Sequence, residues 1–394
     1  MPVRATKRGA ERTHLRRGDC DVLVCGASFA GLAVARELAG SGARVLMVDR
    51  YELGERQTSA CAAPTGWLQA LDLMDSVRQS FREMTVHTRF GSARWSLPFS
   101  FSTFDYPELC ALLRSQAPSP EVEFETATVT GREGSTVHTD RGDLTAPLIV
   151  DALGWRRVLS NATAIQPPAA PLSRGLEVHP PGRSEQMELW IDPRYVRAGY
   201  AWSFPAAEEM RVGAGSFWPS HHVKEPTVRL AGELGLAAEG YQGNWIPHRL
   251  RPAVEDGVFF AGDSAGHCLP LTAEGIRTAL YFGLACGREL REVLDGRRSR
   301  EEALARYGAF SDRHERKYRW LLGTQRLLGQ VTPSRAVTAW VKLLENRRVA
   351  DWIFEHYLGI APPWFVGAGP SGSSSSARAS RRMPSSIAGS ARLA

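Results

Sequence analysis

A chain of 394 residues, 43% of them hydrophobic, is long enough for two or three globular domains. The formal net charge of +6 is carried by the two ends, because residues 1–18 hold six Lys or Arg against one Glu and residues 370–394 hold four Arg and no acid. The rest of the chain is net acidic, which excludes an overall basic surface for nucleic acid.

No apolar stretch is long enough for a transmembrane helix, and the basic N-terminal stretch lacks the apolar core of a signal peptide. The six cysteines show neither a C-x-x-C pair nor metal-ligand spacing, so no metal site is predicted. We expect free thiols, a cytoplasmic protein and a disordered basic extension over residues 1–18.

The first motif lies in residues 21–49. DVLVCG is an apolar run typical of a strand buried on both faces, FAGLAVARELAGSG has helical spacing, and ARVLMVD ends a second strand at Asp49. The pattern predicts a βαβ unit that holds a diphosphate at the helix N-terminus and a ribose at Asp49, although Ser28 replaces the second glycine of G-x-G-x-x-G. A βαβ unit without a ligand is the alternative. The predicted cofactor-binding residues here are Gly26, Ala27, Ser28, Phe29, Ala30, Gly31, Asp49 and Arg50.

The middle of the chain contains two predicted helices and then a predicted antiparallel sheet. LQALDLMDSVRQSF (68–81) and the segment from Pro107 predict helices, and residues 165–250 carry the alternating patterns of an antiparallel sheet. In GYAWSFP the residues Tyr200, Trp202 and Phe204 alternate, so they share one face of a strand. They are predicted to form a flat apolar wall that binds substrate, with packing between two sheets as the alternative.

A second nucleotide signature follows at residues 258–276. VFFAGD is a buried strand that ends in a Gly-Asp turn, and its loop leads into a long helix that begins near residues 272–276. FAD extends beyond the first loop and needs a second binding segment of this kind. Asp263 can accept hydrogen bonds from ribityl hydroxyls, and the helix N-terminus can face the flavin ring. A routine strand–loop–helix is the alternative. The predicted residues are Gly262, Asp263, Gly275 and Ile276.

The C-terminal part is predicted to be helical from residue 273 to residue 360. The segment 340–365 mixes Trp and Phe with Arg and Lys, which is typical of a membrane-surface helix; a helix that caps the substrate domain explains the pattern equally well. GAGPSG (367–372) matches G-x-G-x-x-G fully, but neither acidic residues nor apolar periodicity follow it. We interpret residues 367–394 as a disordered tail.

Several of these motifs resemble a known family. CGASFAG, DALG (151–154) and GDSAGHCLPLTAEGI (262–276) resemble the FAD-binding fold of para-hydroxybenzoate-hydroxylase-like flavoproteins. GYAWSFP and PLTAEGI are similar to the Y-x-W-x-F-P and P-x-T-G-E-G-I motifs of the geranylgeranyl reductase family. The resemblance implies an α/β fold: a Rossmann-like, glutathione-reductase-type FAD-binding domain with an inserted antiparallel substrate domain and a helical C-terminal region. The expected segments are 19–164 and 251–290 for FAD, 165–250 for substrate and 291–366 for the helices.

The resemblance also implies a reaction, in which reduced FAD saturates double bonds of an apolar isoprenoid substrate. It places Cys61 near the flavin as a candidate for proton delivery or loop positioning, although Ala62 stands where a glycine is expected and Tyr106 stands where an arginine is expected. No separate NADPH-binding fold is visible, so NAD(P)H and ferredoxin are both open as electron donors. A flavin monooxygenase or halogenase is the main alternative, and a nucleotide-binding module without catalysis is the remote one.

Overall fold

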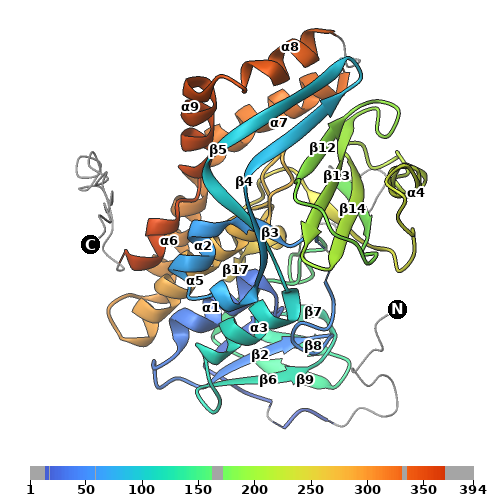
Figure 1. Ribbon diagram of the computed structural model, residues 1–394. Coiled ribbons are helices and arrows are strands. Elements are labelled where there is room, and N and C mark those ends of the chain that lie inside the picture. Colours follow the sequence, from blue (N-terminus) through green and yellow to red (C-terminus); the bar gives the residue numbers. More distant parts are fainter. Residues whose placement is uncertain (1–13, 17, 58, 162–171, 331–334, 369–394) are drawn as a thin grey trace, which may run out of the picture.

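The computed structural model describes residues 14–16, 18–57, 59–161, 172–330 and 335–368. Within them the chain forms a mostly parallel sheet, a larger curled antiparallel sheet, a small three-stranded sheet and a group of C-terminal helices (Figure 1). This arrangement confirms the predicted α/β class with an antiparallel sheet and C-terminal helices. The predicted extension 1–18 and tail 367–394 lie almost entirely outside the described residues.

The parallel sheet is built from short apolar runs. All four residues of the strand that the first motif predicted are buried, as they must be when helices cover both faces of a sheet. The last strand at one edge is the exception to the parallel direction, because it pairs antiparallel with its neighbour. The order is β16 (Val254–Glu255), β17 (Val258–Phe260), β10 (Leu148–Asp151), β1 (Val22–Cys25), β2 (Val45–Asp49) and β6 (Val122–Thr126).

Within the described residues, the helices at this sheet include α1 (Phe29–Leu38), α3 (Tyr106–Ser115) and α5 (Ile276–Leu294). Asp105 caps α3, because its side chain accepts a hydrogen bond from the Glu108 N–H. Helices α1 and α5 pack closely, and a Cβ atom at Gly283 would lie 2.6 Å from the Ala30 carbonyl oxygen. The first motif (21–49) and the second one (258–276), which are far apart in sequence, are therefore held side by side.

The antiparallel sheet is larger than the predicted segment 165–250. Three of its strands come from residues 62–104, which the sequence interpretation had placed in the FAD-binding part, and one strand pair, β12 with β4, is parallel. The predicted helix over 68–81 is wrong over most of its length: α2 (Thr65–Ala70) ends early in the segment, and a short turn η2 (Met74–Ser76) precedes a strand that begins at Val77. The order is β15 (Gln242–Pro247), β11 (Leu172–Val178), β14 (Glu209–Ser216), β13 (Gly199–Ala206), β12 (Glu188–Ile191), β4 (Val77–Thr88), β5 (Gly91–Phe104) and β3 (Ala62–Pro64).

Two smaller units complete the α/β part of the chain. Helix α4 (Lys224–Glu233) packs on the antiparallel sheet through the buried Leu230. The three-stranded sheet follows β6 in sequence and consists of β7 (Val129–Glu133), β8 (Thr136–Thr139) and β9 (Gly142–Thr145).

Two of the C-terminal helices, α8 and α9, lie against the long β4–β5 hairpin, on the side of the molecule away from α4, whereas α6 packs on α5 (Figure 1). The Trp95 Nε1–H donates to the Val341 carbonyl at 2.9 Å, and the Trp67 Nε1–H donates to the Ala361 carbonyl at 2.9 Å. Among the described residues no helix has the length and apolar character needed to cross a bilayer. The helices are α6 (Arg300–Asp312), α7 (Glu315–Gln330), α8 (Arg335–Leu343), α9 (Arg347–Leu358) and the short η4 (Pro363–Gly367).

Candidate functional site

One cavity of about 2450 Å³ connects the carboxyl edge of the parallel sheet, the inner face of the antiparallel sheet and the C-terminal helices. The loops after β1, β2, β10 and β17 all reach it, and this edge is where open α/β sheets bind their ligands. Its volume exceeds that of ordinary small-molecule pockets, which are about 300–1,000 Å³. The cavity is therefore large enough for a dinucleotide and a long second ligand together.

The glycine loop after β1 is as close-packed as the first motif requires. Gly26 has a φ of +109°, and a Cβ atom there would lie 2.2 Å from the Ala152 carbonyl oxygen. A Cβ atom at Gly31 would lie 1.8 Å from the Gly26 carbonyl oxygen, so only glycine lets α1 begin this close to the turn. The loop leaves the N–H groups at the start of α1 facing the cavity, where they can bind a diphosphate. Four residues of the loop line the cavity: Ala27, Ser28, Phe29 and Ala30.

Asp49 fastens this loop as well as lining the cavity. Its Oδ2 accepts a hydrogen bond from the Ala27 N–H at 2.8 Å, and its Oδ1 accepts one from the Tyr51 N–H at 3.0 Å. Burial raises the pKa of Asp49, and backbone donors and the charge of Arg50 oppose that effect. A carboxylate can accept about four hydrogen bonds, so ribose binding by Asp49, with Arg50 beside it in the cavity lining, stays a prediction compatible with this geometry.

Tyr106 completes the loop from the neighbouring helix. Its hydroxyl donates to Ser28 Oγ at 3.1 Å, and its ring packs edge-on against Phe29 with centroids 5.4 Å apart. Tyr106, which stands where an arginine is expected, thus contacts Ser28, which stands where the second glycine of the motif is expected.

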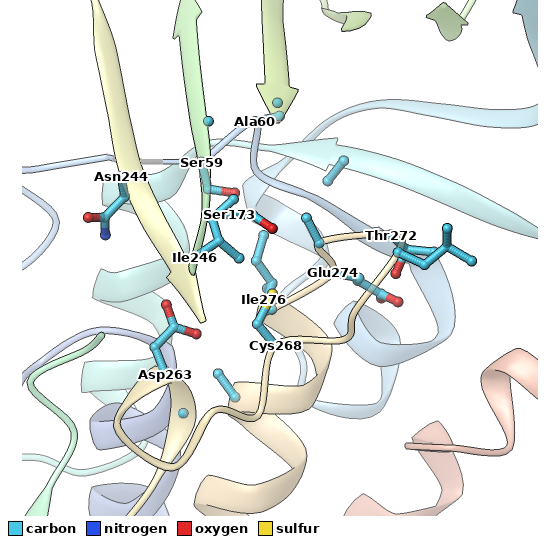
Figure 2. Close-up of a pocket in the computed structure, with 18 of the residues that line it drawn as sticks. Ser59, Ala60, Ser173, Asn244, Ile246, Asp263, Cys268, Thr272, Glu274 and Ile276 are labelled. Atoms are coloured by element: carbon cyan, nitrogen blue, oxygen red, sulfur yellow. The ribbon is translucent and has the colours of Figure 1, made fainter. Parts of the chain in front are cut away.

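The second predicted loop forms the opposite side of the cofactor site. Gly262, which has a φ of +65°, begins the short turn η3 (Gly262–Ala265), and a Cβ atom there would lie 2.9 Å from the Ala30 Cβ. Figure 2 shows the Asp263 carboxylate pointing into the cavity, with Cys268, Thr272 and Glu274 on the loop that runs on to α5. Gly275 and Ile276 also line the cavity, so the start of α5 faces it.

These residues fit FAD. None of the described residues donates a hydrogen bond to the Asp263 carboxylate, although it lies deep in the cavity, and ribityl hydroxyls would supply the missing donors. The close-packed glycine loop would hold the diphosphate, and the first turn of α5 would face the flavin ring.

The protonation of Asp263 is expected to make FAD binding depend on pH. Burial raises the pKa of Asp263 to about 6, and the charge of Arg251 opposes this effect only in part. The same carboxyl in the unfolded chain has a pKa of about 3.9, so the FAD-free protein should lose stability as the pH rises through about 6. Because hydroxyls donate to the ionised carboxylate, FAD affinity should change in the opposite direction and increase between about pH 5 and about pH 7.5.

The variant Asp263→Asn should flatten both profiles and weaken FAD binding, by about tenfold or more. Chemical unfolding of the FAD-free protein and fluorescence titration with FAD measure the two effects separately. Asp75→Asn, at an exposed carboxylate that does not line the cavity, is the matched control. An Asp263→Asn protein that keeps the wild-type pH dependence of FAD affinity would contradict this assignment.

The three predicted aromatic residues line the same cavity, on one face of β13. The Trp202 ring lies flat on glycines, since a Cβ atom at Gly213 would be 2.4 Å from the ring carbon Cζ2. The Trp202 Nε1–H donates to Glu177 Oε2 at 3.2 Å, and Glu177 Oε1 is 2.9 Å from His179 Nε2. Glu177 is buried, so its bond to Trp202 holds the indole in one orientation.

Tyr200 ties this aromatic wall to the cofactor loop. Its hydroxyl donates to the Thr272 carbonyl at 2.6 Å, and its ring lies 6.0 Å from that of Trp202. Phe204, four residues further along β13, extends the wall within the cavity lining. The wall therefore begins at the residues that would surround the flavin ring.

The position of Cys61 in the structure argues against a catalytic role for this residue. Its side chain is completely buried and does not line the cavity, although Ala60 and Ala62 do. Burial raises the pKa of the Cys61 thiol well above its usual value, which keeps it neutral. The residue has a φ of +47° and its carbonyl accepts a hydrogen bond from Arg211, so its place is structural. The cysteine that does line the cavity is Cys268.

Sequence reasoning missed two parts of the site. One is a buried pair in which Arg277 Nε–H and Nη2–H donate to Glu274 Oε1 and Oε2 respectively. Glu274 also accepts a hydrogen bond from the Tyr357 hydroxyl. The signal was present, because an arginine inside an apolar helix needs an acid three or four residues away. The other part is the stretch of cavity wall contributed by α7, which lies before the segment 340–365 that was considered as a helix capping the substrate domain.

Comparisons with known proteins agree with this geometry. Residues 19–133 match a family model described as an FAD binding domain. Digeranylgeranylglycerophospholipid reductase 3 from Methanosphaera stadtmanae is 23% identical over 334 residues, which are 75% of this chain and 83% of that protein. A geranylgeranyl bacteriochlorophyll reductase-like protein from Thermoplasma acidophilum has the same fold, with a TM-score of 0.74 at 17% identity over 83% of this chain and 92% of that one.

A probable FAD-dependent monooxygenase from Pseudomonas aeruginosa also has this fold, with a TM-score of 0.64 at 19% identity over 82% of this chain and 99% of that one. At such identities the structural matches show the fold alone, and many chemistries share it. The family match identifies FAD as the cofactor, and the two loops described above have the geometry to hold it. The chain is thus an FAD-dependent oxidoreductase, a flavoprotein distantly homologous to the digeranylgeranylglycerophospholipid reductases.

Proposed function

We propose that this flavoprotein saturates carbon–carbon double bonds in an isoprenoid lipid. The observation that carries the proposal is the aromatic wall of Tyr200, Trp202 and Phe204, which leads from the cofactor loops into a cavity too large for FAD alone. A long apolar chain fits such a space, and the aligned relative from Methanosphaera stadtmanae is named for a substrate of that kind. When bound and reduced, FAD supplies a hydride to one carbon of the double bond, and a proton completes saturation at the neighbouring carbon.

The residues of the chain position the substrate. The Trp202 indole, fixed from behind by Glu177 and from below by Gly213, offers a flat apolar face against which an alkene can lie. The Tyr200 hydroxyl is engaged by Thr272, so it holds the wall against the cofactor loop and presents its ring to the cavity. Holding the reactants in a productive orientation in this way accelerates a reaction.

A variant of the glycine below Trp202 tests this positioning. Gly213→Ala places a Cβ atom 2.4 Å from the indole, so the ring must move toward the cavity. In stopped-flow experiments without oxygen, a geranylgeranylated glycerophospholipid should reoxidise the dithionite-reduced wild-type protein. The Gly213→Ala protein should retain FAD but be reoxidised about tenfold to a hundredfold more slowly.

Gly232→Ala on α4 is the control, because nothing lies within 4 Å of the added Cβ atom. Equal reoxidation rates for Gly213→Ala and wild type would show that the aromatic wall does not position the substrate. The shared fold with a monooxygenase makes oxygen use the rival chemistry. Reoxidation of the reduced protein by oxygen alone, with no response to the lipid when oxygen is excluded, would favour that rival.

A further inference from the structure

The described C-terminal helices expose an unusual number of large apolar side chains. Four tryptophans are strongly exposed there: Trp320 at 70%, Trp340 at 48%, Trp352 at 62% and Trp364 at 67%. They lie on α7, α8, α9 and η4 respectively, and Leu327 and Leu343 on α7 and α8 are exposed by more than half. Large apolar patches on a protein surface mark sites of contact with another protein or a membrane.

The same four tryptophans line the cavity that holds the proposed substrate wall. A side chain that is both exposed and part of a cavity lining lies where that cavity opens to solvent. On α7 the residues Leu321, Thr324 and Leu328 follow Trp320 at helical spacing and also line the cavity, so one face of this helix continues inward from the opening. The cavity therefore leads from an aromatic opening among the C-terminal helices to the cofactor loops.

The charge of this region adds a second, independent observation. Residues 313–366 hold nine Arg or Lys against four Asp or Glu, although the body of the chain is net acidic. Arg313, Arg316 and Lys317 line the cavity together with Trp320, and all three are exposed at the start of α7. Tryptophan combined with Arg and Lys is the composition of protein surfaces that lie at the headgroup level of a bilayer, where basic residues meet anionic lipid.

We propose that the exposed faces of α7, α8, α9 and η4 dock on the surface of an anionic lipid bilayer. The tryptophans would enter the headgroup region, and the basic residues would contact lipid phosphates. The cavity opening would then face the bilayer, so that an apolar chain can enter it without being exposed to water. This entry route rests on the proposed function, whereas the docking itself does not.

Vesicle binding by the full FAD-loaded chain tests the docking. We expect the protein to sediment with vesicles of phosphatidylglycerol mixed with phosphatidylcholine, to bind pure phosphatidylcholine more weakly, and to be partly released by about 0.5 M salt. The double variant Trp320→Ser/Trp352→Ser should lose affinity for the mixed vesicles by about tenfold or more. Both side chains are mostly exposed, so the flavin absorbance should be unchanged and confirm folding.

The matched control is Val228→Ser/Leu234→Ser, which removes two exposed apolar side chains at α4, away from the C-terminal helices (Figure 1). It should bind the mixed vesicles like wild type. Wild-type protein that stays in the supernatant, or a tryptophan double variant that binds as tightly as wild type, would overturn the proposal. So would a wild-type dimer, seen by light scattering, that the tryptophan variant dissociates, because a second copy would then cover this surface. The measurement needs no turnover, so its result is separate from the success or failure of the reductase assay.

Discussion

Replacing Arg277 by methionine should lower the free energy of unfolding by about 3–5 kcal/mol. Arg277 is completely buried, and its guanidinium bonds both oxygens of Glu274 at 2.8 and 2.7 Å. It also donates to the Ala361 carbonyl at 3.0 Å, which ties the start of α5 to the segment after α9. Methionine leaves the Glu274 carboxylate buried without its counter-ion, and that penalty dominates the effect. Urea unfolding of the FAD-free protein, followed by circular dichroism, measures it.

Two further variants separate this cause from a general loss of packing. Arg229→Met breaks an exposed pair with Glu225 and should cost about 0–1 kcal/mol. The double variant Arg277→Met/Glu274→Gln removes both buried charges and should recover much of the lost stability. If Arg277→Met were as stable as Arg229→Met, the buried pair would not stabilise the junction between the start of α5 and the segment after α9.

Gly26→Val should abolish FAD binding. A Cβ atom at this position would lie 2.2 Å from a backbone oxygen, and the φ of +109° is unfavourable for any residue with a side chain. The turn can open only by moving the start of α1, which carries the N–H groups expected to hold the diphosphate. The purified variant should be colourless, with a flavin-to-protein absorbance ratio near zero where wild type approaches one FAD per chain.

Circular dichroism must show that the variant is folded for this result to count. Asp263→Asn supplies a second approach to the same site, because it should weaken FAD binding by changing a cavity-lining carboxyl to which none of the described residues donates. Gly232→Ala, in open space on α4, should retain full FAD content. A folded Gly26→Val protein with wild-type FAD content would remove the glycine loop from the cofactor site.

The parts of the fold that sequence predicted correctly are those with local signals. The strand before Gly26, the helix after it and the strand ending at Asp49 are contiguous, and each has the apolar pattern of a buried element. The Gly-Asp turn at Gly262 could be recognised for the same reason. Both loops reach one cavity because parallel strands present their carboxyl ends at the same edge of the sheet.

The antiparallel sheet was only partly predictable, because its strand pairing is long-range. Strand β4 pairs with β12, and residues Thr85 and Glu188 are partners across 103 positions of sequence. The segment 68–81 reads as a helix because Met74, Val77 and Phe81 recur at the helical spacing of three and four residues. From Val77 onward, pairing with β5 makes the segment a strand in spite of its local helical pattern.

The candidate site shows the same division. Alternation along a strand correctly put Tyr200, Trp202 and Phe204 on one face, whereas the glycines beneath Trp202 and its bond to Glu177 come from other strands. Cys61 was placed near the ring by family position alone, and the buried strand connection around it turns its thiol away from the cavity. No local sequence pattern predicts which way a side chain points in such a connection.

The most direct test of the central claim is the identity of the product. Dithionite-reduced protein and a geranylgeranylated glycerophospholipid, mixed without oxygen, should yield a lipid that has gained two hydrogen atoms for each double bond attacked, as read by mass spectrometry. Deuterium should appear in that product when the reaction is run in heavy water, since one of the two hydrogens arrives as a proton. An unchanged lipid without oxygen, together with a lipid that gains an oxygen atom once air is admitted, would contradict the account and identify a monooxygenase.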